Sequence, residues 1–98
     1  MEEIRFEWTA AKAAQNRRKH RVRFDEAQTV FADEDALLLE DPLHSDGEDR
    51  FHMLGLSAQL RVLLVVHCYR EAGGVVRLIS ARRATPTERA QYGARWNP

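Results

Sequence analysis

The sequence predicts an α+β fold in which helices pack on an antiparallel β-sheet. Three observations lead to this prediction. An alanine-rich segment near the N-terminus has the composition of a helix, and apolar strand-like runs fill residues 36–83. A Thr-Pro-Thr-Glu motif at residues 85–88 then marks the start of a last helix. Because 98 residues is the size of one domain, we expect a single domain over residues 1–98.

The N-terminal third is predicted to hold one short strand and two helices. Ile4–Trp8 alternates as an edge strand does, and Thr9 is a suitable N-cap for a helix that runs to about His20. A second helix is expected over Phe24–Phe31, because its apolar residues fall on one helical face.

The rest of the chain is predicted to form four strands and the last helix. The third strand is apolar at every position from 62 to 66, as expected of a central strand covered on both faces. A loop is expected over residues 41–47, a hairpin turn at residues 72–74, and a helix from Thr85 to about Trp96. The four strands are Ala36–Glu40, Arg50–Leu56, Arg61–Tyr69 and Val75–Arg83.

The composition argues against secretion, membrane anchoring and a disulfide framework. The longest apolar run has five residues, far short of the roughly 18 that cross a bilayer. The acidic N-terminus lacks the pattern of a signal peptide, and Cys68 is the single cysteine. We therefore expect a cytoplasmic protein that does not bind membranes.

The formal net charge of zero hides three blocks of unlike sign. Residues 1–24 hold seven basic and three acidic residues, residues 25–49 hold ten acids and no base, and residues 50–98 hold eight arginines and two acids. This pattern predicts two basic patches that meet in space. It is equally compatible with blocks that neutralise one another across the fold. Arginine outnumbers lysine thirteen to two, a bias that favours phosphate or carboxylate recognition.

The sequence contains no motif for a metal or a nucleotide cofactor. The four histidines and Cys68 lack the spacing of zinc ligands, and no P-loop, dinucleotide-binding or nucleophile-elbow motif is present. His67 is expected to be a hydrogen-bonded core residue, and Cys68 a small buried hydrophobe. We expect no cofactor.

The remaining polar residues fit metal-independent RNA cleavage. That reaction needs a base for the 2′-hydroxyl proton, cations for the charge at phosphorus, and an acid for the departing 5′-oxygen. Helical spacing places Lys12, Asn16 and Lys19 on one polar stripe, with His20 beside it. Glu48 or Asp49 is a possible base. The candidate cations and proton carriers are Lys19, His20, Arg50, Arg82 and Arg83.

The last strand separates two of these arginines. Strict alternation places Ser80 and Arg82 on one face and Arg77, Ile79, Ala81 and Arg83 on the other. Arg82 and Arg83 therefore cannot both reach one site, and we favour Arg82. For each arginine the competing interpretation is a solvated residue or a partner of the acidic segment.

Taken together, the polar motifs resemble the BrnT family of ribonuclease toxins from type II toxin–antitoxin pairs. The resemblance extends from Phe6 to Tyr92. The motifs that carry it are Lys12-x3-Asn16-x2-Lys19-His20, Glu48-x-Arg50-Phe51, Ile79-Ser80-Ala81-Arg82-x-Ala84 and Glu88-Arg89-x2-Tyr92. The family usually has glycine after Lys-His, which suggests a left-handed helix end, but this chain has Arg21 there. Either the turn differs in this chain, or Arg21 tolerates the strain.

The resemblance implies a RelE-like fold and an endoribonuclease that inhibits translation and growth. It implies a BrnA-like antitoxin with a ribbon-helix-helix part, and contact with operator DNA only through that antitoxin. Carried over by motif, the catalytic candidates are Lys19, His20, Glu48, Arg50 and Arg82. Lys12, Arg61 and Arg83 are expected to bind RNA. The general base is either His20 or Glu48.

A different class of function also fits the sequence. In this alternative the chain is a non-catalytic subunit that binds a partner within an autorepressing antitoxin–DNA complex. The acidic segment at residues 25–49 motivates it, because such a segment repels nucleic acid and attracts a basic partner. RNA cleavage by the isolated chain discriminates between the two hypotheses.

Overall fold

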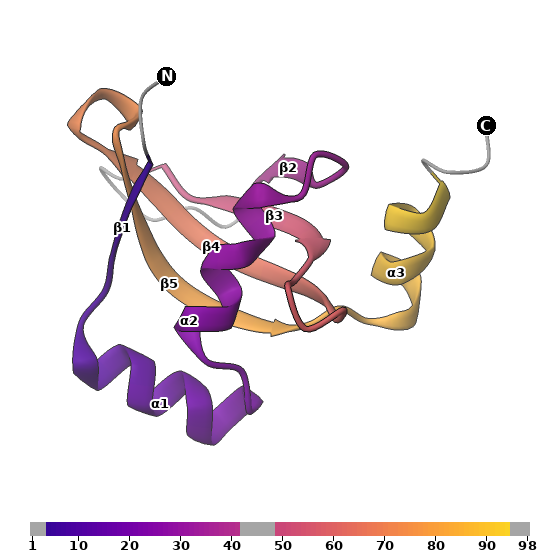
Figure 1. Cartoon of the computed structure of the whole chain (residues 1–98), viewed down its shortest axis with the longest axis horizontal. Helices are drawn as coiled ribbons and strands as arrows, with labels where there is room; N and C mark the ends of the chain where they lie inside the picture. The colour runs from indigo at the N-terminus through magenta and orange to yellow at the C-terminus, as the bar shows by residue number, and fades with distance from the viewer. Residues whose placement is uncertain (1–3, 42–48, 95–98) are drawn as a thin grey trace.

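The computed structural model describes residues 4–41 and 49–94, which form a five-stranded sheet with helices at its edge and on its faces (Figure 1). The predicted order of elements is confirmed. The strands are β1 (Arg5–Glu7), β2 (Leu37–Glu40), β3 (Phe51–Leu56), β4 (Val62–Arg70) and β5 (Val75–Arg83). The helices are α1 (Ala10–His20), α2 (Phe24–Ala27) and α3 (Pro86–Gly93), with short 3₁₀ helices at Gln28–Ala32 and Glu71–Gly73.

The prediction of a purely antiparallel sheet was wrong at one edge. The strand order is β1-β5-β4-β3-β2, and β2 to β5 are antiparallel neighbours. β1 instead runs parallel to β5, with Arg5 opposite Val75 and Glu7 opposite Arg77. A hairpin forces antiparallel pairing, but β1 and β5 are separated by most of the chain and carry no such constraint.

Both ends of α1 follow from local sequence. The Thr9 hydroxyl accepts a hydrogen bond from the Lys12 amide at 3.1 Å, which confirms the predicted N-cap. At the other end Arg21 adopts φ 58° and ψ 35°, and its amide donates to the Arg17 carbonyl at 2.9 Å. Of the two alternatives, Arg21 therefore adopts the left-handed conformation and tolerates its strain. An arginine there carries a strain of about 1 kcal/mol that glycine avoids.

Asn16 joins α1 to the edge of β5. Asn16 lies beside Lys12 and Lys19, as the predicted stripe has it, but it is buried and only 5% exposed. Its side-chain oxygen accepts from the Ala81 amide at 3.0 Å, and its nitrogen donates to the Ala81 and Val22 carbonyls, both at 2.9 Å. The amide thus pairs with β5 as another strand would, at a position that β1 does not reach.

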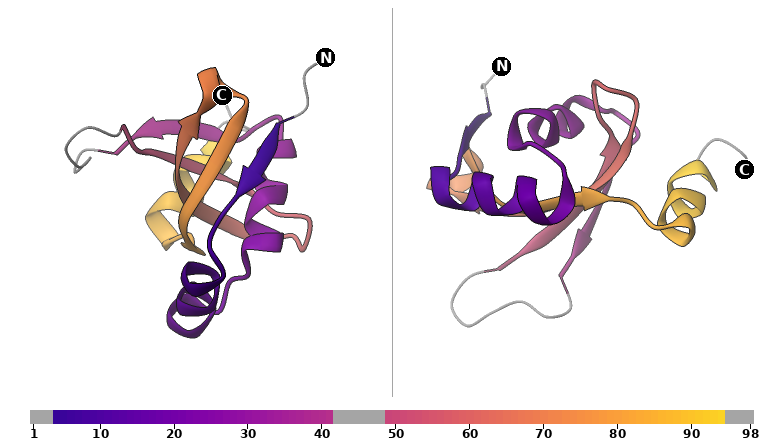
Figure 2. Two further views of the ribbon diagram at one scale, coloured as in Figure 1. Left: turned by 90° about the vertical axis from the view of Figure 1, so that its left-hand side faces the viewer. Right: turned by 90° about the horizontal axis from the view of Figure 1, so that it is seen from below.

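The sheet has an apolar cluster on each face. Leu63 and Val65 of β4 pack with Phe24 and other residues of α2, whereas Leu64 packs with Tyr92 of α3. β4 is therefore covered on both sides, as its apolar run predicts. Figure 2 shows α2 and α3 on different sides of the sheet.

A β-bulge in β5 corrects the predicted alternation. Val66 pairs with Ser80 while His67 pairs with Leu78, so Ile79 is an extra residue in β5. Ala81 consequently lies in the same core cluster as Leu78, not on the face of Arg77. Beyond the bulge the alternation is regular.

The second helix is shorter than predicted, and α3 is held in place by Asp33, a residue from the segment after that helix. α2 ends at Ala27 and continues as a 3₁₀ helix to Ala32. The capping box of Thr85 and Glu88 is confirmed. The carboxylate of Asp33 accepts from the Tyr92 hydroxyl at 2.6 Å and from the Leu56 amide at 2.8 Å. Asp33 is therefore structural, whereas the sequence placed it in a possible acidic docking surface.

Replacing Asn16 should destabilise the fold. Asn16→Ala removes three hydrogen bonds and leaves the buried Ala81 backbone groups without these partners. We expect a loss of about 3 kcal/mol in the free energy of unfolding, measured by urea denaturation. Gln15→Ala, at an exposed site on the same helix, is the control and should change stability by less than about 0.5 kcal/mol. A stable Asn16→Ala variant would contradict this account.

Candidate active site

The predicted meeting of two basic segments occurs between α1 and β5. A pocket of about 160 Å³ opens there, next to the Asn16 side chain that joins α1 to β5. Lys12 and Lys19 come from α1, His20 from its last turn, and Ser80 from the strand. Residues more than 50 positions apart are therefore brought together. The pocket is lined by Lys12, Gln15, Asn16, Lys19, His20, Ile79 and Ser80.

His20 has an environment that favours its neutral form. Partial burial lowers its pKa below the ordinary value of 6.5, and the positive charges of Lys19 and Arg82 lower it further. The imidazole is therefore uncharged near neutral pH and able to accept a proton. Ser80, which lines the pocket, and Arg82 are alternate residues of β5 beyond the bulge and therefore share a face of the sheet.

Arg82 is held in a fixed orientation by Glu88. Two of its nitrogens donate to the two carboxylate oxygens, at 2.8 and 2.9 Å. The same carboxylate accepts from the Thr85 amide in the capping box of α3. The Arg82 hydrogen bond is the main reason that the pKa of Glu88 falls from 4.5 to about 2. α3 thereby fixes the guanidinium on its face of the sheet.

Arg50 lies on the same face but in a separate cluster. It donates to Asp41 from two nitrogens, at 3.0 and 3.2 Å, and His52 contacts the same oxygen at 3.2 Å. In the strand register Arg50 is four residues and two strands from Arg82, a separation of about 16 Å between Cα atoms. The structure therefore brings His20 near Arg82 and leaves Arg50 apart on the same face.

Sequence reasoning overlooked two members of this second cluster. Asp41 is 4% exposed and pairs with Arg50 across β2 and β3, and His52 follows Arg50 by two residues. Strand alternation alone places Arg50 and His52 on one face, so that signal was present in the sequence. The pairing of Arg50 with Asp41 could not be predicted from the sequence, because it depends on the register between β2 and β3.

The other candidate residues lie elsewhere. Arg61 forms a two-point ion pair with Glu26, which is 5% exposed and also accepts from the Ser57 hydroxyl at 2.7 Å. Arg83 is exposed and faces away from Arg82, as predicted, because their partners Leu63 and Leu64 belong to opposite core clusters. Glu48 lies outside the described residues.

The two residues that sequence analysis assigned to the core are buried. His67 is fully buried, contacts the Val65 carbonyl at 3.1 Å and the Tyr69 hydroxyl at 3.2 Å, and its pKa is lowered by burial. Cys68 is 1% exposed. Among the described residues no three histidine, cysteine, aspartate or glutamate side chains are placed to hold a metal ion. Over residues 4–41 and 49–94, every helix is too short or too polar to cross a bilayer.

Comparison with known proteins identifies the family. The sequence model of a protein family, described as the ribonuclease toxin BrnT of type II toxin–antitoxin systems, matches residues 8–88. This chain belongs to the BrnT family. The crystal structure of the Brucella abortus ribonuclease toxin BrnT has the same fold, with a TM-score of 0.63 and 20% sequence identity over 85% of this chain and 99% of that chain. No curated protein matches the sequence.

Family membership gives this BrnT chain its general role. As the toxin of a type II toxin–antitoxin system, it has an antitoxin as its partner. The α+β fold expected for a BrnT toxin is confirmed, with the parallel β1 as the difference from the predicted sheet.

The ion pair between Arg82 and Glu88 predicts a pH dependence of stability. The pKa of Glu88 is lower in the folded state than in the unfolded state, so unfolding takes up a proton between about pH 2 and pH 4.5. The stabilising effect is present above pH 4.5 and is lost as the pH falls toward 2. Urea denaturation at several pH values should show that the free energy of unfolding of Glu88→Gln depends less on pH than that of wild type between about pH 2 and pH 4.5. A wild-type dependence in that variant would contradict the assignment.

Proposed function

We propose that this BrnT toxin is a metal-independent endoribonuclease that cleaves RNA to inhibit translation and growth. The observation that carries the proposal is the position of His20. Its neutral imidazole lies in a pocket with Lys12 and Lys19 and within electrostatic range of Arg82. This set of groups supplies a proton acceptor and several cations, which are what cleavage of a ribose phosphodiester requires.

In the proposed reaction the neighbouring 2′-hydroxyl of the RNA is the nucleophile. His20 takes its proton, the 2′-oxygen bonds to phosphorus, and the bond from phosphorus to the 5′-oxygen breaks. Lys19 and Arg82 stabilise the added negative charge, and Lys19 donates a proton to the departing oxygen. The products are a 2′,3′-cyclic phosphate and a free 5′-hydroxyl. DNA is not a substrate, because it lacks the 2′-hydroxyl.

The other candidate residues receive supporting roles. Lys12 lines the pocket and contacts a neighbouring phosphate. Arg50 contacts RNA farther along the same sheet face. Glu48 stays the alternative general base, and RNA contacts by Arg61 and Arg83 stay predictions. The ion pair of Arg61 with Glu26 gives Arg61 a structural role in any case.

We propose a BrnA-like ribbon-helix-helix antitoxin as the partner, which alone contacts operator DNA. The competing hypothesis is a non-catalytic binding subunit. Its acidic-surface test must avoid Asp33, because this carboxylate anchors Tyr92 and β3. Charge reversal at the exposed Glu34 and Glu40 tests that surface without disturbing the anchor. Loss of antitoxin binding in a protein that never cleaves RNA would favour the alternative.

Removing the proposed base or the main cation should abolish cleavage. We expect His20→Ala and Arg82→Ala each to lower the rate of RNA cleavage by about 10²- to 10⁴-fold while the proteins stay folded. The assay uses purified protein, excess chelator, and both free RNA and translating ribosomes. Unfolding curves of both variants are the control for folding. An active Arg82→Ala variant would remove Arg82 from the site, and absence of cleavage by the wild-type protein would reject the enzyme.

The pH dependence of cleavage should change when Lys19 is replaced, because the charge of Lys19 lowers the pKa of His20. Since His20 acts as the base, cleavage is lost as the pH falls below its pKa, which lies under 6.5. Lys19→Met should slow cleavage, because Lys19 is also the proposed proton donor. It removes a charge that lowers the His20 pKa as well, so the acid limb of the remaining kcat/KM should move to higher pH. Lys12→Met is the matched control from the same pocket, and its acid limb should stay in place. An unmoved limb in Lys19→Met would favour Glu48 as the base.

A further inference from the structure

α1 presents a second basic flank that the proposed reaction does not use. Successive residues are about 100° apart around a helix. Lys12, Gln15 and Lys19 consequently occupy the flank beside the catalytic pocket, and Asn16 faces the sheet. The opposite flank carries Arg17, Arg18 and Arg21, and Arg23 follows after the helix. We call these four arginines the arginine groove.

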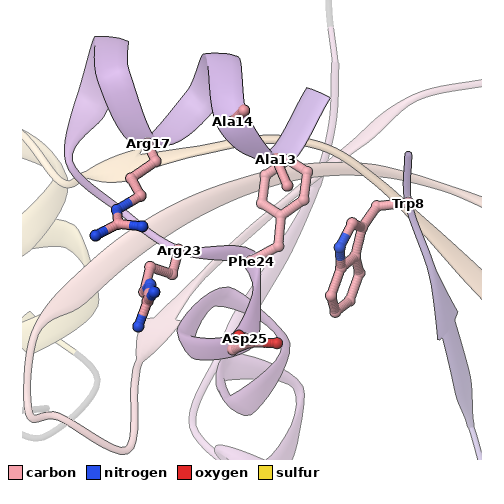
Figure 3. Close-up of a pocket in the computed structure, with 7 residues that line it drawn as sticks. All are labelled: Trp8, Ala13, Ala14, Arg17, Arg23, Phe24 and Asp25. Atoms are coloured by element: carbon pink, nitrogen blue, oxygen red, sulfur yellow. The ribbon is translucent and has the colours of Figure 1, made fainter. Parts of the chain in front are cut away.

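Three adjoining hollows give the groove its shape, and Arg17 lines all of them. The largest lies over the helix, and one of about 320 Å³ reaches Gln59 and Arg61 in the turn between β3 and β4. Figure 3 shows a third, where Arg17 and Arg23 project side by side and the Trp8 ring closes the far end. The groove therefore has the adjacent guanidinium groups of Arg17 and Arg23 at one end and the apolar ring of Trp8 at the other.

The guanidinium groups of the groove have no carboxylate partner within the part of the chain that the structure describes, because none of the four forms an ion pair there. Glu26, which borders the groove, is already occupied by Arg61 and Ser57. Asp25 lies at one rim without such a contact to these arginines. Outside the groove, Arg5, Arg50, Arg61 and Arg82 form ion pairs with described carboxylates, whereas Arg77, Arg83 and Arg89 form none with the described residues. The groove differs from these three in gathering four such arginines around adjoining hollows.

Two features of the groove lower the stability of the folded protein. Arg17 and Arg21 are like charges four residues apart, a spacing that destabilises a helix. Arg21 is also strained, because its left-handed backbone suits glycine. The helix dipole favours cations in the last turn, yet this does not account for Arg23, which lies beyond the helix. Unpaired charge held at a strained position is typical of a binding site.

We propose that the arginine groove binds the phosphate backbone of the RNA outside the scissile bond. This inference rests on the proposed function, since it assigns a second contact surface to the same substrate. The planar fork of arginine matches phosphate oxygens. The catalytic pocket and the groove lie on opposite flanks of one helix, which is about 10 Å across with its side chains. A single strand crossing the C-terminal end of α1 therefore reaches both.

The test measures binding of a fluorescent 2′-O-methyl RNA 12-mer, which lacks the attacking hydroxyl and stays intact. Fluorescence anisotropy is recorded over a range of salt concentrations for wild type, Arg17→Gln, Arg21→Gly, Arg23→Gln and the triple variant. We expect about a 3-fold loss of affinity per arginine and about 30-fold for the triple variant. The slope of log K against log salt should shrink by about 0.7 for each arginine removed.

Two controls separate binding from folding. Arg5→Gln removes the same charge at an exposed site paired with Glu71, and its affinity and salt slope should match wild type. Arg21→Gly relieves the strained backbone, so its midpoint of thermal unfolding should rise while its RNA affinity falls. A purely structural role for Arg21 would not produce these opposite changes.

The possible outcomes distinguish this inference from the proposed function. Wild-type affinity in the triple variant, with cleavage still lost in His20→Ala, overturns the groove and leaves the enzyme intact. Loss of antitoxin binding with unchanged RNA affinity also overturns it and assigns the groove to the protein partner. Groove-dependent RNA binding by a wild-type protein that never cleaves RNA supports the groove and rejects the enzyme. A wild-type protein that does not bind RNA rejects both.

Discussion

The position of α1, which carries the basic residues of the pocket and of the arginine groove, depends on the buried side-chain amide of Asn16. Asn16 satisfies both backbone groups of Ala81 at the free edge of β5 and also holds the Val22 carbonyl just beyond α1. These bonds fix the C-terminal half of α1 against the sheet. His20 is thereby held near Ser80 and Arg82, and the opposite flank of the helix is turned outward. A helix attached only by apolar contacts would be less precisely placed, because such contacts have no direction.

The distribution of ion pairs explains how a chain of zero net charge presents basic surfaces. Carboxylates of the acidic segment are used inside the fold, where Glu26 holds Arg61 and Asp41 holds Arg50. Glu88 similarly holds Arg82. The interpretation that the charge blocks neutralise one another across the fold therefore holds for some of the arginines. Other arginines, such as Arg17 and Arg23 at the surface between α1 and α2, form no ion pair with residues 4–41 or 49–94.

The candidate site was predictable in part. Helical spacing grouped Lys12, Lys19 and His20, and strand alternation separated Arg82 from Arg83, because these patterns depend on neighbours in the chain. The separation of Arg50 from the pocket was not predictable, since it depends on how β3, β4 and β5 are aligned. The same holds for the contact of Asp41 with Arg50 and His52, and for the anchoring of Tyr92 by Asp33.

The sequence by itself determined the order of the elements and the caps at Thr9 and Thr85. Each of these features is set by residues within one turn of it, so spacing alone encodes it. Only the tertiary structure decided that β1 is parallel to β5, that β5 contains a bulge, and which arginines are neutralised. Those outcomes are choices among distant partners, and they depend on the register of the sheet as a whole.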